Sequence, residues 1–226
     1  MTFAIDDRIH PAQSYLNLYQ LRALQNTSGW DMVNGTQLDV DAVRAYYDQN
    51  DLAGYASDIL QQAAWLEANG LNSAPNWIIY PRGDTNGALE QVVGRYYMFG
   101  RGIINDPDSY PFSNPKDVGN LEIRYPGDGE GDDAGYTSPS LVLAAVKSAE
   151  KYHTTLLLTF NRIHSEPSDL PGYPLALFEE VIDGIRASGI RVMTLSQLDR
   201  SDGVPVDNHI YVNDGERSLI TAAITG

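Results

Sequence analysis

Short apolar runs alternate with segments of helical periodicity along most of this 226-residue chain. Apolar residues recur at helical spacing in residues 13–25, 53–69 and 139–152. Strands that are separated by helices pair in parallel, so the alternation predicts an α/β fold, either a barrel or a doubly wound sheet. The expected strands are residues 2–5, 30–33, 77–80, 99–104, 121–125, 154–160 and 191–194.

Residues that begin and end helices support several of these boundaries. Ser138 followed by Pro139 is typical of a helix start, with serine as N-cap and proline in the first turn. Gly70 and Gly189 follow apolar helical stretches and are expected to end them as C-terminal glycines. Further helices are predicted at residues 40–47, 87–97 and 173–188.

Composition narrows the range of partners. The formal net charge is −15, which disfavours a nucleic-acid partner because phosphates are repelled by such a surface. Cysteine is absent, so the chain has no disulfide, no thiolate metal ligand and no cysteine nucleophile. No apolar run reaches the length of a membrane span.

Polar residues follow several of the expected strands. Asp6 and Asp7 come directly after the first expected strand. In the segments WDMVNGTQLD and LLLTFNRIHSEP, polar residues likewise follow an expected strand. In βα-repeat folds the carboxyl ends of the strands form the mouth of the active site. We therefore expect a polar site where these strand ends converge.

The ordered segments FAIDD, GWDMVNGTQLD, WIIYPRGDTN, LLLTFNRIHSEP and GIRVMTLSQL resemble the polysaccharide deacetylase family, the NodB-homology domains of carbohydrate esterase family 4. The resemblance covers about residues 2–198. It implies a distorted (β/α) barrel of the polysaccharide deacetylase type over residues 1–200. Two β runs around an Asn-Asp-Gly turn predict a C-terminal β-hairpin extension over residues 201–226.

The resemblance assigns the first strand end to catalysis and metal binding. Asp6 matches the family's catalytic base, and Asp7 matches a metal ligand. Gly35 and Asp39 stand where the family has two metal-binding histidines. Glycine offers no ligand, and an aspartate in place of imidazole favours harder ions than zinc or weak binding.

The later segments match the family's groove and its general acid. Tyr80, Pro81 and Arg82 match a turn that lines the substrate groove. Asn161 stands where the late acid histidine is expected, and asparagine cannot shuttle a proton at neutral pH. His164 follows three residues later and is an alternative acid, although an ordinary loop histidine is the favoured interpretation.

By resemblance the chain is a metal-dependent hydrolase that removes acetyl groups from a glycan with a divalent ion such as zinc. The replaced histidines imply weak or absent metal binding and reduced or lost activity. The alternative is a catalytically inactive glycan-binding or structural module. A metal-free glycosidase that uses Asp7 and Asp39 ranks last. A secreted, cell-surface or virion-associated location is favoured over the cytoplasm, and no oligomeric state is predicted.

Other acidic residues have simpler interpretations. Residues 128–133 (DGEGDD) are expected to form an acidic surface loop, with calcium binding as a minor alternative. Asp84 and Asn86 are expected either to line the groove or to cap the helix that begins near Gly87. An ion pair of Arg82 with Asp6 or Asp7 is also predicted.

Overall fold

The computed structural model describes residues 2–5, 16–36, 38–102, 112–124, 137–160, 163–164 and 172–201. The chain divides into two compact units. Unit 1 comprises Met1–Gly102, Pro115–Asp117 and Met193–Gly226, and unit 2 comprises Ile103–Asn114 and Val118–Val192. The described parts of each unit contain their own parallel strands and their own hydrophobic core.

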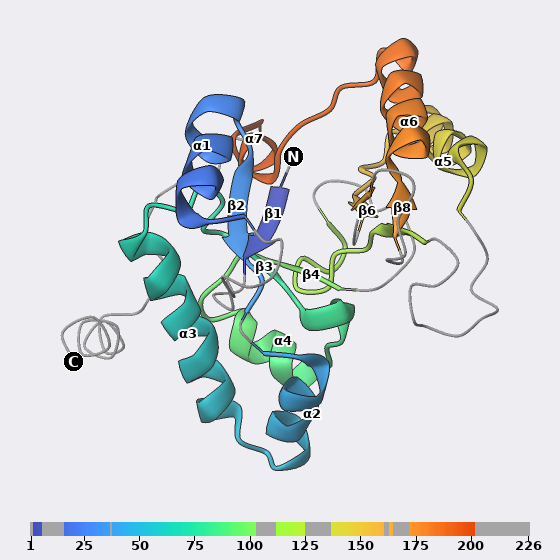
Figure 1. Cartoon of the computed structure of the whole chain (residues 1–226). Coiled ribbons are helices and arrows are strands. Elements are labelled where there is room, and N and C mark those ends of the chain that lie inside the picture. Colours follow the sequence, from blue (N-terminus) through green and yellow to red (C-terminus); the bar gives the residue numbers. More distant parts are fainter. Residues whose placement is uncertain are drawn as a thin grey trace. The chain divides into compact units, whose positions relative to one another are not determined.

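Unit 1 is built on a four-stranded parallel sheet in the order β1-β2-β3-β4 (Figure 1). The strands are β1 (Thr2–Ile5), β2 (Asp31–Asn34), β3 (Trp77–Ile79) and β4 (Phe99–Arg101). Each neighbouring pair runs parallel, with Thr2 opposite Asp31 and Trp77 opposite Phe99. The carboxyl ends of all four strands therefore lie at one edge of the sheet, as the alternating sequence pattern predicts.

Two helices of unit 1 begin at residues that cap the helix N-terminus and end shortly before glycines with positive φ. In α1 (Leu18–Ser28), Asn17 and Gln20 form a reciprocal capping box, and Gly29 ends the helix in the left-handed conformation. Gly70, just beyond the end of α3, also has a positive φ of 66°. The other helices of this unit are α2 (Val40–Asp48), α3 (Leu52–Ala68), the 3-10 turn η1 (Pro81–Gly83), α4 (Gly87–Val93) and α7 (Leu195–Ser201).

The main core of unit 1 lies between α3, α4 and the middle of the sheet. Tyr55 and Ile59 of α3 pack with Ile78 of β3 and with Leu89 of α4, and all four side chains are fully buried. Helix α3 is apolar over much of its circumference, which is expected of a helix that contacts β2 on one side and α2 and α4 on others.

The described residues of unit 2 form two short parallel pairs of strands and two helices. Strands β5 (Leu121–Ile123) and β6 (Leu158–Phe160) form one pair, and β7 (Ile163–His164) and β8 (Tyr173–Pro174) form the other. Helices α5 (Pro139–Tyr152) and α6 (Leu175–Ser188) pack against each other. Their buried residues join Ile123 and Tyr173 in a second core.

The expected barrel is wrong for the part of the chain that the structure describes. There the strands form three separate sheets, and β1 and β4 each pair with a neighbour on one side alone. A closed barrel needs every strand to be paired on both sides. The expected strand at residues 191–194 is not formed, and Val192 within it is 73% exposed. The expected hairpin of residues 201–226 lies outside the described residues, apart from the end of α7 at Ser201.

Most local predictions are confirmed. Ser138 caps α5, with Pro139 in its first turn, and Gly189 ends α6 in the left-handed conformation. The run at residues 154–160 is strand only over Leu158–Phe160 and is half-buried rather than buried. Helix α7 was not predicted, because its sequence LSQLDRS has little apolar periodicity.

Candidate functional site

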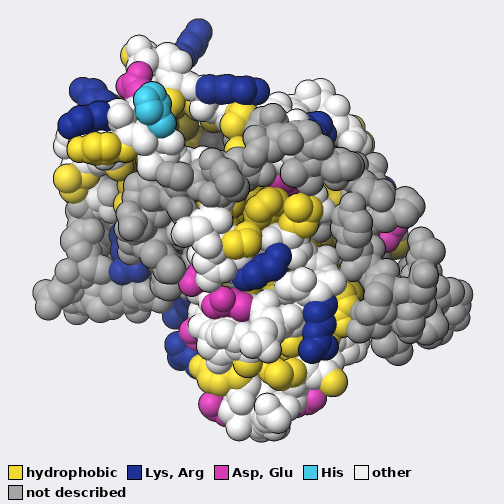
Figure 2. Space-filling model, turned by 180° about the vertical axis from the view of Figure 1, so that it is seen from behind, with side chains coloured by type: hydrophobic (Ala, Val, Ile, Leu, Met, Phe, Trp, Pro, Cys, Tyr) yellow, Lys and Arg dark blue, Asp and Glu magenta, His cyan; other side chains and the backbone are white. Residues whose placement is uncertain are grey.

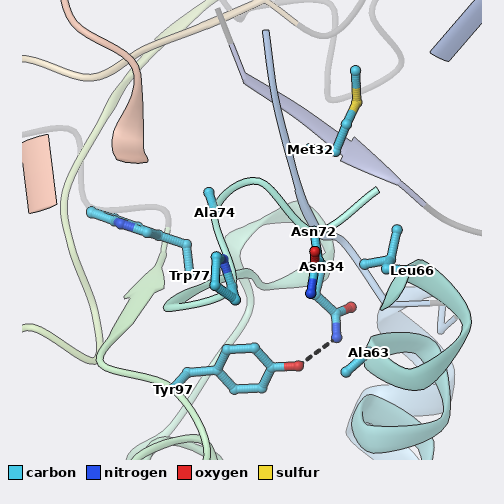
Figure 3. Close-up of a pocket in the computed structure, with 9 residues that line it drawn as sticks. Met32, Asn34, Ala63, Leu66, Asn72, Ala74, Trp77 and Tyr97 are labelled. Carbon is cyan, nitrogen blue, oxygen red and sulfur yellow. Dashed lines mark hydrogen bonds between the residues drawn. The ribbon is translucent and has the colours of Figure 1, made fainter. Parts of the chain in front are cut away.

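The carboxyl end of β2 is closed by hydrogen bonds within the protein. Asn34 ends this strand and is 3% exposed. Its side-chain nitrogen donates to the hydroxyl of Tyr97 at 2.6 Å and to the carbonyl of Ile59 at 2.9 Å. Its side-chain oxygen accepts from the backbone N–H of Thr36 at 2.8 Å. The Asn34 amide therefore joins β2 to α3 and to the segment before β4, and Figure 3 shows the Tyr97 hydroxyl pointing toward it.

A small cavity of about 20 Å³ lies beside this amide. That volume has room for about one water molecule, whereas sites for small-molecule ligands usually occupy hundreds of Å³. Burial raises the pKa of the Tyr97 hydroxyl, so this group stays protonated. The cavity is a feature of the core and cannot admit a sugar ring. Its lining residues are Met32, Asn34, Ala63, Leu66, Asn72, Ala74, Pro75, Trp77 and Tyr97.

The two positions at which the resemblance places metal-binding histidines follow Asn34 in the sequence. Gly35 is half-buried and has no side chain to offer. Thr36 has a positive φ of 59°, and its amide is fixed to Asn34. Asp39 is exposed and is the N-cap of α2, since its Oδ1 accepts from the backbone N–H of Ala42 at 2.8 Å. The carboxylate expected as a metal ligand thus satisfies a helix terminus.

The carboxyl end of β3 has a different character. Tyr80 follows the strand, is fully buried, and donates its hydroxyl proton to the carbonyl of Lys116 at 2.8 Å. Pro81 begins the 3-10 turn η1, which is closed by hydrogen bonds from Gly83 to Tyr80 and from Asp84 to Pro81. Arg82 at the centre of the turn is exposed and adopts the left-handed conformation (φ 50°, ψ 18°).

Neighbouring elements support this turn. Arg44 of α2 binds Asp84 at 2.6 Å, and the hydrogen bond and charge of Asp84 raise the pKa of Arg44. Asn86 caps α4 by accepting from Ala88 and Leu89, which confirms the capping alternative for this residue. At Gly100 of β4, a Cβ atom would lie 2.7 Å from the Tyr80 hydroxyl, so the approach of Tyr80 requires glycine there.

Two acidic groups act electrostatically on the Tyr80 hydroxyl. Burial raises the pKa of the Tyr80 hydroxyl above its ordinary value, with smaller contributions from Tyr55, Glu90 and Asp117. Desolvation, followed by the charge of Glu90, also raises the pKa of Asp117. The Asp117 Oδ1 atom is buried and has no hydrogen-bond partner. The end of β3 therefore has polar groups of Tyr80 and Asp117 in its interior and the side chain of Arg82 at its surface.

The structure brings together only part of the expected site. Tyr80, Pro81 and Arg82 form one turn, and Asp39 lies at the start of α2, the helix that Arg44 joins to Asp84 of that segment. The expected base Asp6, the expected ligand Asp7 and the acid position Asn161 lie outside the described residues. His164 is described through its backbone in β7 of unit 2. The predicted ion pair of Arg82 with Asp6 or Asp7 and the loop 128–133 also lie outside the described residues.

The described residues do not supply the donor set that zinc requires. Among them, no group of three or more His, Cys, Asp or Glu side chains could hold a metal ion. Zinc in hydrolases is usually held by three protein side chains, mostly imidazoles. Gly35 contributes none, and the Asp39 carboxylate is used by the helix terminus.

Sequence reasoning missed the role of Asn34. The signal available was an amide side chain directly after two apolar strand residues, in the segment MVNG. A buried amide needs partners, but its partner Tyr97 lies 63 residues away and could not be identified from the sequence.

No family model matches the chain, and no curated protein matches it. None of the helices among the described residues is long and apolar enough to cross a membrane. On the face that Figure 2 shows, acidic and basic side chains of the described residues are interspersed rather than segregated.

Proposed function

We propose that this chain is a polysaccharide deacetylase-like domain that binds a glycan, with its metal-dependent deacetylase activity reduced or lost. The observation that carries the proposal is the contrast around Asp39 and Arg82. The expected ligand Asp39 caps α2, while the segment from Tyr80 to Gly83 forms a tight turn that exposes Arg82. A glycan partner also favours a secreted, cell-surface or virion-associated location.

The turn has properties suited to sugar hydroxyls and acyl oxygens. Arginine presents several N–H donors in a fixed plane, and these can bind neighbouring oxygen atoms together. The backbone of Arg82 lies within a turn closed by the two hydrogen bonds of η1, and the Arg44–Asp84 ion pair joins the end of that turn to α2. A prearranged donor loses less conformational entropy when a ligand binds.

The loss of activity is tested by metal content and acetate release. We expect the purified protein to carry less than stoichiometric zinc, nickel or cobalt by elemental analysis. We also expect no acetate release from N-acetylated chito-oligosaccharides or acetylated xylan. Tight stoichiometric metal together with acetate release would instead establish an active deacetylase.

Glycan binding is tested by titration calorimetry with N-acetylchitohexaose and with acetylated xylan oligosaccharides. Arg82→Ala is expected to weaken binding at least tenfold. The matched control is Arg95→Ala, because Arg95 is an exposed arginine of the same unit that lies after α4 and outside the turn. Equal affinity in the two variants would show that the turn does not bind the sugar.

Restoration of the ligands tests descent from a metal enzyme. The variant Gly35→His, Asp39→His and Asn161→His replaces the three positions where the family has histidine. Regained zinc binding would support an inherited, disabled site. Unchanged metal content in a folded triple variant would mean that these segments do not correspond to the family's motifs. Asp39→Ala alone controls for the lost helix cap.

A further inference from the structure

Helix α7 is attached to the sheet of unit 1 through two buried carboxyl groups. Asp31, the first residue of β2, is 4% exposed, and Asp199 of α7 is 0% exposed. Carboxyl groups are rarely buried to this extent unless they are well partnered. Both lie at the amino ends of the strands, away from the strand ends discussed above, so the site is distinct from the proposed glycan site.

Each of these carboxyl groups accepts two hydrogen bonds from the opposite element. Ser196 of α7 donates its backbone N–H to Asp31 Oδ2 at 2.7 Å and its hydroxyl to Asp31 Oδ1 at 2.9 Å. Trp77 Nε1 donates to Asp199 Oδ1 at 3.0 Å, and Asn76 Nδ2 donates to Asp199 Oδ2 at 3.3 Å. Four side-chain hydrogen bonds therefore hold α7 against β2 and the start of β3.

The two buried carboxyl groups repel each other, and Arg200 is the cation that acts on Asp199. The groups that act electrostatically on Asp199 are Asp31 from β2 and Arg200 from α7, while Trp77 and Asn76 are neutral donors. The Arg200 side chain donates to Ser196 Oγ at 3.0 Å. Burial, followed by repulsion from Asp31, raises the pKa of Asp199, and this outweighs the opposing effects of Trp77, Asn76 and Arg200.

We propose that Asp31 and Asp199 form a pH-sensitive latch that holds α7 on the sheet more tightly when Asp199 is protonated. In α7 detached from the sheet, Asp199 is solvated and has an ordinary carboxyl pKa of about 4. The docked state binds the proton more tightly than the detached state does. Attachment is therefore strongest below about pH 4, weakens as pH rises toward the raised pKa, and levels off above it.

The wild-type test uses the amide protons of α7 and the indole of Trp77. Hydrogen exchange of residues 193–201 is measured between pH 4 and pH 8 and divided by the chemical exchange rate at each pH. Protection is expected to fall by up to about tenfold for each pH unit within the window, the limit for release of one proton. The Trp77 indole resonance should titrate around the pH at which the protection levels off, because both then report Asp199 in the docked state.

Variants assign the effect to the two carboxyl groups. Asp199→Asn should make protection of α7 independent of pH, and Asp31→Asn should move the midpoint to lower pH because it removes the repulsion. Asp183→Asn, at an exposed position of α6, should behave like the wild type. A wild-type profile that is flat, or one that Asp31→Asn leaves unmoved, would overturn the proposal. If Asp199→Asn does not fold, a Trp77 indole midpoint near pH 4 in the wild type would also overturn it.

Discussion

The ends of strands β2 and β3 lie next to each other in one sheet but use their polar residues differently. At the end of β2, Asn34 is bonded on all sides by Tyr97, Ile59 and Thr36, and Asp39 caps a helix. At the end of β3, Tyr80 is buried and fixed to Lys116, whereas Arg82 is exposed on a tight turn. The polar groups at the end of β2 are used in hydrogen bonds within the fold, whereas the end of β3 leaves Arg82 at the surface.

The difference lies in what the polar groups at the two strand ends are bonded to. A metal ligand must keep lone pairs directed at the ion. The Asp39 Oδ1 lone pairs are directed at a backbone N–H, and Gly35 has none to offer. An arginine that contacts a ligand at a surface must be exposed, and Arg82 is exposed on a hydrogen-bonded turn. The hydrogen bonds that the polar groups make therefore distinguish the two strand ends better than the residue types do.

The largest expected effect on stability is at the carboxyl end of β2, where Asn34 is fully hydrogen-bonded. Asn34→Ala removes three hydrogen bonds and leaves the buried amide of Thr36 without its acceptor. The Ile59 carbonyl keeps the Tyr97 hydroxyl at 3.4 Å. We expect the free energy of unfolding to fall by about 3 kcal/mol, as follows from unsatisfied buried polar groups. Urea denaturation followed by tryptophan fluorescence measures it.

A matched control for that change is Asn26→Ala, at an exposed position of α1, which should cost less than about 0.5 kcal/mol. In a double-mutant cycle with Tyr97→Phe, the two losses should be clearly non-additive because the side chains are bonded to each other. Equal losses for Asn34→Ala and Asn26→Ala would break the contrast, since the end of β2 would then not depend on Asn34.

The sequence predicts the local elements better than their assembly. The Ser138-Pro139 start of α5 and the glycine ends of α3 and α6 depend on a few neighbouring residues, and all are confirmed. The barrel prediction required that separate strands close on one another, which depends on contacts between distant segments. The missing strand at residues 191–194 and the three separate sheets of the described residues show the limit.

The same limit applies to the candidate site. The turn at Tyr80 and Pro81 was predicted from a contiguous motif and forms a turn. The attachment of Asp199 to Trp77 spans 122 residues, and that of Ser196 to Asp31 spans 165 residues. Neither pairing leaves a local pattern, because a single buried aspartate in LSQLDRS resembles a surface residue of any short helix.

An intermediate effect tests whether Asp39 acts as a cap or as a ligand. Asp39→Ala removes the hydrogen bond to Ala42 and should lower the free energy of unfolding by about 1 kcal/mol. Asp39→Asn retains a capping oxygen and should restore most of that stability. Metal content should be the same in all three proteins. Loss of a bound metal in Asp39→Asn, which keeps the cap, would show that β2 ends in a metal site.

The smallest expected effect on stability is at the carboxyl end of β3, where Arg82 is exposed. Arg82 has a φ of 50°, a region that costs a residue with a Cβ atom more than it costs glycine. Arg82→Gly should raise the free energy of unfolding by about 0.5 kcal/mol after the extra flexibility of the unfolded chain is included. Arg95→Gly is the matched control and should be destabilising, because Arg95 is not among the residues with positive φ.

Binding measured on the same two variants completes this test. Arg82→Gly should bind N-acetylchitohexaose more weakly although it is the more stable protein, because the turn keeps its shape and loses its donors. A gain in stability with unchanged affinity would show that the Arg82 side chain has no role in binding. A loss of stability would show that the Arg82 side chain holds the turn together, and the two strand ends would then both serve the fold.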